Sequence, residues 1–161
     1  MMSSNVQQQT LSTSSKYFKM PVAVHLVLQK NDEVLLLLRQ GTGFCDGHYS
    51  VVAGHLDGGE SATSAMIREA AEEAGILIEA KDLTFSCMTH RFSPDRESID
   101  IFYTCATWKN EICNKEPHKC GELRFFPKAQ LPSNMVGYVR DGILKSMGNQ
   151  PYSEYGWKEA T

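Results

Sequence analysis

The chain has 161 residues, of which 42% are hydrophobic and 22% are charged, and its formal net charge is −3. This much apolar material suffices for the core of one soluble domain and excludes a chain that is disordered throughout. The mild acidic balance argues against a protein that coats a nucleic acid polymer, because binding to a phosphate backbone needs a basic excess or stripe. The negative charge is concentrated, since residues 54–76 hold five Asp and Glu side chains against Arg68 alone.

The five cysteines favour a reducing, cytoplasmic setting. Their number is odd, no pair has CxxC spacing, and the N-terminus lacks a basic-then-apolar signal pattern. Cys113, His118 and Cys120 come nearest to a zinc cluster, but they lack a fourth ligand at a recognisable spacing. The longest apolar run, residues 34–38, is far below the roughly 20 residues that span a bilayer. We therefore expect neither a zinc site nor a membrane segment.

The order of predicted elements indicates an α+β fold, an α/β sandwich with a mixed sheet. Residues 1–16 are rich in Ser, Gln and Thr, so they are predicted to form a disordered N-terminal arm. One domain is expected over residues 17–148. The remaining residues, 149–161, are aromatic-rich but have no pattern, and they are predicted to form a C-terminal tail.

The first half of the domain predicts a β-hairpin, loops and a helix. Two Val- and Leu-rich stretches, 22–29 and 33–38, flank the turn residues Lys30-Asn31-Asp32. After them we expect a loop over 40–47, a strand over 49–53 and a loop over 54–60. The stretch 61–74 contains no Gly or Pro and ends at Gly75, a typical helix C-cap residue. The second half predicts three strands and a helix, over residues 83–92, 98–108, 122–126 and 135–147.

Three glutamates in the first predicted helix point to a divalent-cation site. Glu69, Glu72 and Glu73 are three or four positions apart, so they project together while aliphatic residues occupy the opposite side. Such crowding of like charges is unfavourable unless cations sit among the carboxylates, and hard oxygen ligands select Mg²⁺ or Mn²⁺. The alternative is a solvated acidic face in which Arg68 and Glu72 form an i,i+4 pair.

The string around these glutamates favours the cation site. It runs Gly54-His55-Leu56-Asp57-Gly58-Gly59-Glu60, seven further residues, then Arg68-Glu69-Ala70-Ala71-Glu72-Glu73-Ala74-Gly75-Ile76. This string resembles the Nudix box, G-x5-E-x7-R-E-U-x-E-E-x-G-U with U aliphatic, at every fixed position. Two departures affect local packing: Ala70 is small for its position, and Val52-Ala53 replaces the Pro-Gly that often precedes the box.

The resemblance implies the Nudix fold, an α/β/α sandwich with a mixed β-sheet between helices. It also implies that Mg²⁺ or Mn²⁺ is bound by Glu69, Glu72, Glu73 and the Gly54 carbonyl. A glycine makes physical sense there, because the backbone must approach the ion closely. Glu60 and Arg68 are implied as a buried structural pair that fixes the loop against the helix, with Arg68 also orienting Glu69.

Bound cations would neutralise a diphosphate and lower the pKa of a bound water, which makes water the expected nucleophile. One carboxylate must accept its proton, and Glu69 is the first choice because it is central on the helix face. Glu116 is a second candidate. The string Glu116-Pro117-His118-Lys119-Cys120 resembles the EPxKC stretch that follows the box in nucleoside-triphosphate-cleaving members, although a solvated loop glutamate is the alternative.

Four further residues are candidates for contacts with substrate. Arg39 is placed like an arginine that contacts the nucleotide in some family members, and its planar fork suits phosphate, but a surface arginine ending a strand is the alternative. Asn134 matches an asparagine that reads the base in oxidised-guanine-cleaving members. A helix N-cap before Met135 is the favoured interpretation of Asn134. Arg91 and Lys119 are either further cations near phosphate or solvated side chains.

The sequence therefore predicts a Mg²⁺-dependent Nudix hydrolase that acts on a small-molecule nucleotide. The preferred substrate is a (d)NTP, with a purine or oxidised purine favoured, converted to (d)NMP and pyrophosphate. The alternatives are an ADP-ribose or nucleotide-sugar pyrophosphatase and a non-catalytic nucleotide-binding module. The resemblance also allows a homodimer, since dimers are common in the family.

Overall fold

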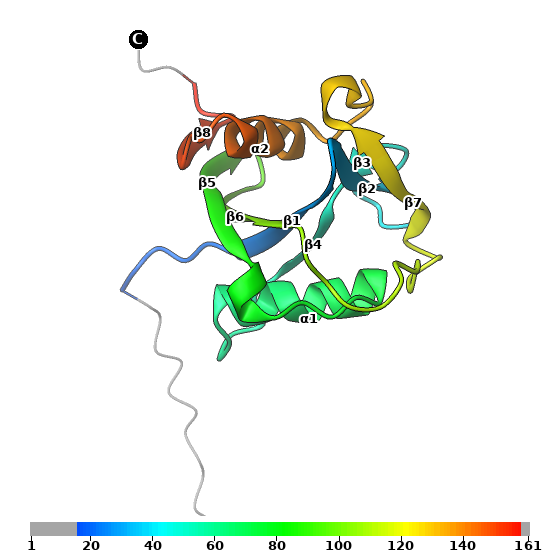
Figure 1. Ribbon diagram of the computed structural model, residues 1–161. Coiled ribbons are helices and arrows are strands. Elements are labelled where there is room, and N and C mark those ends of the chain that lie inside the picture. Colours follow the sequence, from blue (N-terminus) through cyan, green and yellow to red (C-terminus); the bar gives the residue numbers. More distant parts are fainter. Residues whose placement is uncertain (1–15, 159–161) are drawn as a thin grey trace, which may run out of the picture.

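Strand β1 is the point at which the β-sheet divides into two arms (Figure 1). The computed structural model describes residues 16–158, so the predicted N-terminal arm lies outside the described residues except for Lys16. The strands are β1 (Val22–Lys30), β2 (Glu33–Arg39), β3 (Tyr49–Ser50), β4 (Val52–His55), β5 (Thr84–Ser93), β6 (Arg96–Cys105), β7 (Cys120–Pro127) and β8 (Tyr152–Tyr155). The helices are α1 (Ala62–Ala74) and α2 (Gly137–Met147), and short 3-10 helices cover Ala80–Asp82 and Lys128–Gln130.

The predicted hairpin of β1 and β2 is confirmed, but it opens almost at once. Gln29 pairs with Val34 and Lys30 with Glu33, and no further residues of these two strands are paired with each other. The rest of β1 pairs with β4 and, in parallel, with β6, whereas β2 pairs with β3 and β7. The two arms of the sheet therefore separate beyond the hairpin turn, and both strands contribute residues to a cavity described below.

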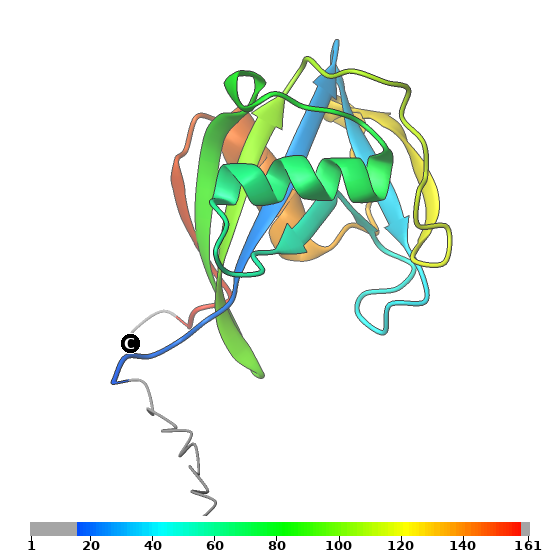
Figure 2. The ribbon, with the colours of Figure 1, turned by 90° about the horizontal axis from the view of Figure 1, so that it is seen from below.

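The two helices cover opposite faces of the arm that contains β1 (Figures 1 and 2). Met66 and Ala70 of α1 belong to a buried cluster with Val24 of β1. Val139 of α2 belongs to a second cluster with Phe102 of β6. The structure thus confirms the predicted α+β sandwich with a mixed sheet between helices.

Helix α1 begins and ends where the sequence predicts. The Ser61 hydroxyl accepts a hydrogen bond from the backbone N–H of Ser64 at 3.1 Å, which caps the first turn. At the other end Gly75 adopts φ 67°, the left-handed conformation that glycine tolerates best, and its N–H donates to the Ala71 carbonyl. The glutamates of this helix are thereby held in fixed register.

The strand predicted over 49–53 is two strands, because the chain changes arms at Val51. Ser50 pairs with Leu37 of β2, whereas Val52 pairs with Leu26 of β1. Gly54 and His55 were predicted to lie in a loop, but they belong to β4, where Gly54 pairs with Val24. This extension places the backbone of Gly54 beside α1.

Helix α2 starts two residues later than predicted, and Asn134 is not its cap. The N-cap is Val136, whose side chain makes no capping hydrogen bond. The Asn134 side-chain amide nitrogen instead donates to the Gly47 carbonyl at 3.0 Å. The backbone carbonyl of Asn134 accepts a hydrogen bond from the Tyr49 N–H at 2.8 Å. The favoured interpretation of Asn134 was therefore wrong, because the residue joins the loop before β3 to the segment before α2.

Residues 152–155, which the sequence places in the C-terminal tail, form β8. This strand pairs in parallel with β5, with Met88 opposite Tyr152 and Arg91 opposite Tyr155. With only four residues, this segment is too short for an alternation of apolar and polar side chains to predict a strand.

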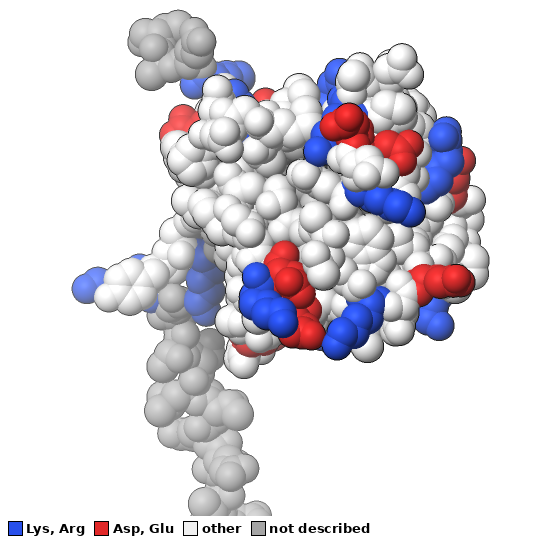
Figure 3. Space-filling view, in the orientation of Figure 1, with Lys and Arg blue, Asp and Glu red and all other residues white. Residues whose placement is uncertain are grey.

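The exposed surface carries both signs of charge. On the face shown in Figure 3, acidic and basic side chains lie next to one another and form no broad basic stripe. Among the described residues, no helix is long and apolar enough to cross a membrane.

We predict that Gly142→Ala destabilises the protein although alanine is the better helix former. A Cβ at Gly142 would lie 2.1 Å from the ring of Phe102, which is fully buried. Overpacking of this kind costs about 1–3 kcal/mol and outweighs the 0.5–1 kcal/mol that alanine gains in a helix. Urea unfolding should show the loss, with Leu144→Ala at an exposed α2 position as the control. A Gly142→Ala protein as stable as wild type would contradict this packing.

Candidate active site

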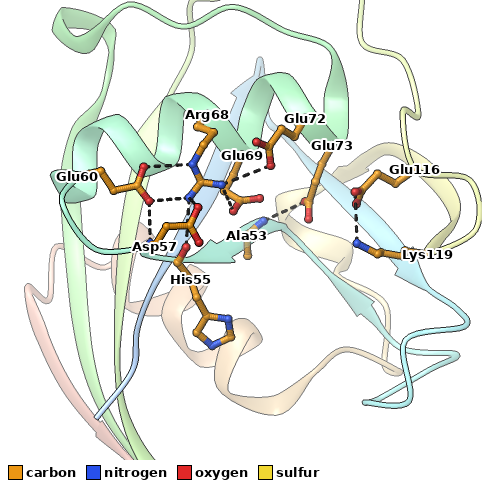
Figure 4. A network of polar contacts seen from close by, with 10 residues as sticks. All are labelled: Ala53, His55, Asp57, Glu60, Arg68, Glu69, Glu72, Glu73, Glu116 and Lys119. Atoms are coloured by element: carbon orange, nitrogen blue, oxygen red, sulfur yellow. Dashed lines mark hydrogen bonds and ion pairs between the residues drawn. The ribbon is translucent and has the colours of Figure 1, made fainter. Parts of the chain in front are cut away.

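Arg68 of α1 connects this helix to the end of β4 and to the loop over residues 56–61 that follows β4 (Figure 4). Its Nε and Nη2 donate to the two carboxylate oxygens of Glu60 at 3.1 and 2.7 Å, and Nη2 also donates to the His55 carbonyl at 3.2 Å. Nη1 donates to Glu69 at 2.7 Å and more weakly to Glu72 at 3.4 Å. The structure thus forms the implied Glu60–Arg68 pair, and Arg68 also orients Glu69.

Gly54 leaves the space that the Glu69 carboxylate occupies. A Cβ at position 54 would lie 2.0 Å from Oε1 of Glu69, so no larger residue fits without moving this side chain. Glu69 is only 9% exposed. Burial raises the pKa of its carboxyl, and the hydrogen bond from Arg68 opposes that effect. The sequence therefore brings a buried carboxylate directly against the backbone of β4.

Glu73 is the most strongly perturbed carboxyl of the helix. Its Oε2 accepts a hydrogen bond from the Ala53 N–H at 3.2 Å. Burial raises the pKa of Glu73 to about 8, and the nearby carboxylates of Glu69 and Glu116 add to the increase. A half-buried acidic group with this environment is stabilised in its charged form by a cation.

The three helix glutamates do not share one solvated face. Glu69 and Glu73 are directed toward β4, whereas Glu72 is exposed beside Arg68 (Figure 4). Within residues 16–158, no three His, Cys, Asp or Glu side chains are gathered as a preformed metal site. The donor set still suits Mg²⁺ or Mn²⁺, because it offers hard oxygen ligands and the glycine at 54 lets a carboxylate approach the backbone.

A cavity of about 470 Å³ lies next to these glutamates. Six of the predicted site residues line it: Gly54, Glu73, Glu116, Lys119, Arg39 and Arg91. Glu60, Arg68, Glu69, Glu72 and Asn134 are not among its lining residues. The cavity therefore connects the α1 glutamates with the arginines of β2 and β5.

Glu116 and Lys119, which both line the cavity, form an ion pair (Figure 4). Lys119 Nζ donates to Glu116 Oε1 at 3.3 Å, and the Glu116 carbonyl accepts hydrogen bonds from the N–H groups of Lys119 and Cys120. The turn is thus closed by its own backbone, which fixes a carboxylate and an ammonium on the cavity wall.

Arg39 is fixed by the loop that follows β2. Its Nε donates to the Phe44 carbonyl at 2.7 Å and its Nη2 to the Thr42 hydroxyl at 3.0 Å. The guanidinium also lies 5.4 Å from the centre of the Phe44 ring. Both Arg39 and Phe44 line the cavity, so this loop presents a cation and an aromatic ring to it.

A buried polar cluster at the cavity was not predicted. Asp100 of β6 is fully buried, accepts hydrogen bonds from His25 Nε2 at 2.9 Å and Arg91 Nε at 2.8 Å, and is also bonded by Ser98. Burial alone would raise the pKa of Asp100, but its hydrogen bonds and charge interactions with His25 and Arg91 lower it instead. The signal in the sequence was a carboxylate at an inward position of a strand, between Ser98 and Phe102.

A family model described as the NUDIX domain matches residues 19–145. The chain belongs to the Nudix family. This Nudix hydrolase is 29% identical to an 8-oxo-dGTP diphosphatase of Proteus vulgaris over 98 residues, which cover 61% of the chain and 86% of that protein. It is 28% identical to an ADP-ribose pyrophosphatase of Methanocaldococcus jannaschii over 144 residues, 87% of the chain and 80% of that protein.

Solved structures agree on the fold of this Nudix hydrolase. A MutT NUDIX hydrolase from Burkholderia pseudomallei superimposes with a TM-score of 0.73 at 21% identity, over 80% of the chain and 98% of that protein. The NUDIX domain of Shewanella oneidensis NrtR, solved in complex with ADP ribose, gives a TM-score of 0.66 at 17% identity over 82% and 89%.

We predict that Asp100→Asn destabilises the Nudix hydrolase at neutral pH by about 3–5 kcal/mol, because it leaves Arg91 buried without its counterion. The folded-state pKa of Asp100 is lowered, so its stabilisation is complete above the unfolded value of about 3.9. It is lost as the pH falls through the lower folded value. Urea unfolding from pH 7 to pH 3 should show the gap between wild type and variant narrowing only below about pH 4.

The exposed turn residue Asp95 provides the control, since Asp95→Asn should have only a small effect. A gap between wild type and Asp100→Asn that stays constant across this pH range would contradict a charged Asp100 in the folded protein.

Proposed function

We propose that this Nudix hydrolase cleaves the diphosphate bond of a nucleoside triphosphate, giving a nucleoside monophosphate and pyrophosphate. The observation that carries the proposal is the single cavity that Glu73 and Glu116 share with Arg39, Phe44 and Arg91. It combines oxygen ligands for cations with guanidinium groups and an aromatic ring. These are the chemistries that a polyphosphate and a base require.

The proposed cation ligands are Glu69, Glu72, Glu73 and the Gly54 carbonyl. When bound, Mg²⁺ or Mn²⁺ supplies charge neutralisation of the diphosphate and a lowered pKa of the attacking water. Arg68 keeps Glu69 in place at 2.7 Å while Glu60 holds the other edge of the same guanidinium. Arg68 thereby fixes one of the proposed ligands, Glu69, before substrate arrives.

Glu69 is the proposed general base, and Glu116 the second candidate. A carboxyl whose pKa is raised accepts a proton more readily, and burial acts in that direction on Glu69. Glu116 has the advantage of lining the cavity, although its carboxylate is paired with Lys119. In this scheme the carboxylate takes a proton from water while the water oxygen attacks a phosphorus of the diphosphate; the P–O bond to the bridging oxygen breaks, and the nucleoside monophosphate and pyrophosphate separate.

Substrate contacts are proposed for Arg39, Arg91, Lys119 and Asn134. The first three line the cavity, and each has a cationic side chain. Asn134 is not among the residues that line the cavity, and its side-chain nitrogen already donates to the Gly47 carbonyl. A hydrogen bond from Asn134 to the base would therefore use its side-chain oxygen as the acceptor. A cytoplasmic setting and a homodimer stay predictions.

A second candidate substrate is ADP-ribose. The similarity to an ADP-ribose pyrophosphatase extends over 87% of the chain, further than the similarity to the 8-oxo-dGTP diphosphatase.

Glu69, Glu72 and Glu73 are all present, which favours an enzyme over a module that only binds a nucleotide.

The substrate class can be tested with a panel of dNTPs, 8-oxo-dGTP, ADP-ribose, nucleotide sugars and dinucleoside polyphosphates. We expect triphosphates to give monophosphate and pyrophosphate, resolved by chromatography and ³¹P NMR. A chelator should abolish turnover, and added Mg²⁺ should restore it. Faster cleavage of ADP-ribose than of any triphosphate would select the second candidate, and turnover that persists in chelator would exclude the cation site.

We predict that Glu69→Gln and Glu73→Gln each lower turnover by about a hundredfold or more, because each removes a carboxylate from the proposed cation and proton-transfer site. Initial rates with the best substrate of the panel would measure the loss. Glu79→Gln is a matched control, since Glu79 is exposed and pairs with Lys81 and Lys109. Near-wild-type rates in both helix variants would remove these residues from the site.

A further inference from the structure

Arg91 is a buried arginine whose guanidinium group is held along one edge by a carboxylate and on one face by an aromatic ring. Its Nε donates to Asp100 at 2.8 Å, and its guanidinium carbon lies 4.0 Å from the centre of the Tyr138 ring of α2. Asp100 is itself held by His25 and Ser98, so the carboxylate that anchors Arg91 cannot easily rotate. The orientation of the guanidinium is therefore set by β1, β6 and α2 together.

The remaining edge of Arg91 is available to a ligand. Neither Nη1 nor Nη2 of Arg91 donates to another described residue, and neither is among the fully buried polar atoms that lack a partner. Arg91 is 6% exposed and lines the cavity, so its uncommitted donors lie at or near the cavity wall. The chain thus offers two parallel N–H donors at a fixed position.

The charge and shape of this region favour a neutral, flat ligand over a phosphate. Asp100 already balances the charge of Arg91, and a phosphate at the Nη edge would meet the negative carboxylate behind it. Apolar side chains of Ala23, Leu37, Val51 and Leu123 also line the cavity, which suits the face of an aromatic ring. Phosphate has a better alternative at Lys119 and the proposed cation ligands.

We propose that Arg91 reads the O6 and N7 edge of a guanine base, with Asp100 and Tyr138 as positioning residues. An arginine fork matches two adjacent acceptors, which guanine presents on this edge, whereas adenine places an amino donor there. 8-Oxoguanine carries a hydrogen on N7 and offers only one of the two acceptors. The inference rests on the proposed function, and it names an unmodified guanine nucleotide as the preferred substrate class.

Calorimetric titration with nucleoside monophosphates in chelator tests the inference apart from hydrolysis. The wild-type protein should bind dGMP about tenfold or more tightly than dAMP, with 8-oxo-dGMP in between. Arg91→Lys keeps the charge but loses the fork, so the ratio of the two affinities should fall toward one, mainly through weaker dGMP binding. A general loss of structure would weaken both nucleotides alike and would leave the ratio unchanged.

Arg124 provides a matched control. It pairs with Glu122 and lies 3.9 Å from the centre of the Phe126 ring, so it shares with Arg91 a carboxylate partner and a stacked aromatic ring, but it is exposed and is not among the residues that line the cavity. Arg124→Lys should keep the wild-type ratio. An equal change of the ratio in both variants would overturn the assignment to Arg91.

Ligand variants test the same contact without any substitution, in case Arg91→Lys fails to fold. dIMP keeps O6 and N7 and should bind nearly as well as dGMP, whereas 7-deaza-dGMP lacks N7 and should bind several-fold more weakly. Equal binding of dGMP and dAMP, or of dGMP and 7-deaza-dGMP, by the wild-type protein would overturn the proposal. Triphosphate cleavage without guanine preference would reject this inference alone, whereas the panel experiment separately decides the proposed function.

Discussion

The contacts of Arg68 are the interaction on which the rest of the site depends. One guanidinium binds Glu60 with two nitrogens, Glu69 with a third and the His55 carbonyl from the same side. The Glu60 and Glu69 interactions raise the pKa of Arg68, so its charge is permanent. Without that charge, Glu69 would be buried against the Gly54 backbone with no positive partner. The loop, the helix and the end of β4 are therefore positioned by a single side chain.

The divergence of β1 and β2 supplies the second requirement, which is space. A hairpin paired along its whole length would bring both strands into one continuous layer, but only two residue pairs form here. The change of arms at Val51 then brings β4 back to β1, with Ala53 beside Glu73. As a result, the acidic end of α1 and the buried Asp100 cluster border the same cavity although they come from opposite faces of one sheet.

Local chemistry explains which features could be predicted from the sequence. The α1 helix and its terminal glycine depend on nearby residues and were predicted correctly, and the spacing of Glu60 and Arg68 indicated the pair that the structure forms. The Asp100 cluster depends on pairings between strands 75 residues apart in the chain, as between His25 and Asp100, and no local pattern encodes them. Asn134 was misassigned for the same reason, since its partner Gly47 lies 87 residues away.

Strand β8 determines where this protein can be truncated or fused to another protein. It covers the outer edge of β5 with backbone hydrogen bonds, and its residue Tyr155 is paired with Arg91. A chain that ended at Asn149 would expose the unpaired N–H and C=O groups of β5, which are a template for strand addition by another molecule. Strand β8 thus replaces part of the ten-residue edge of β5 by an edge strand of only four residues, and a short edge strand offers less backbone for strand addition, so fusion partners belong beyond it.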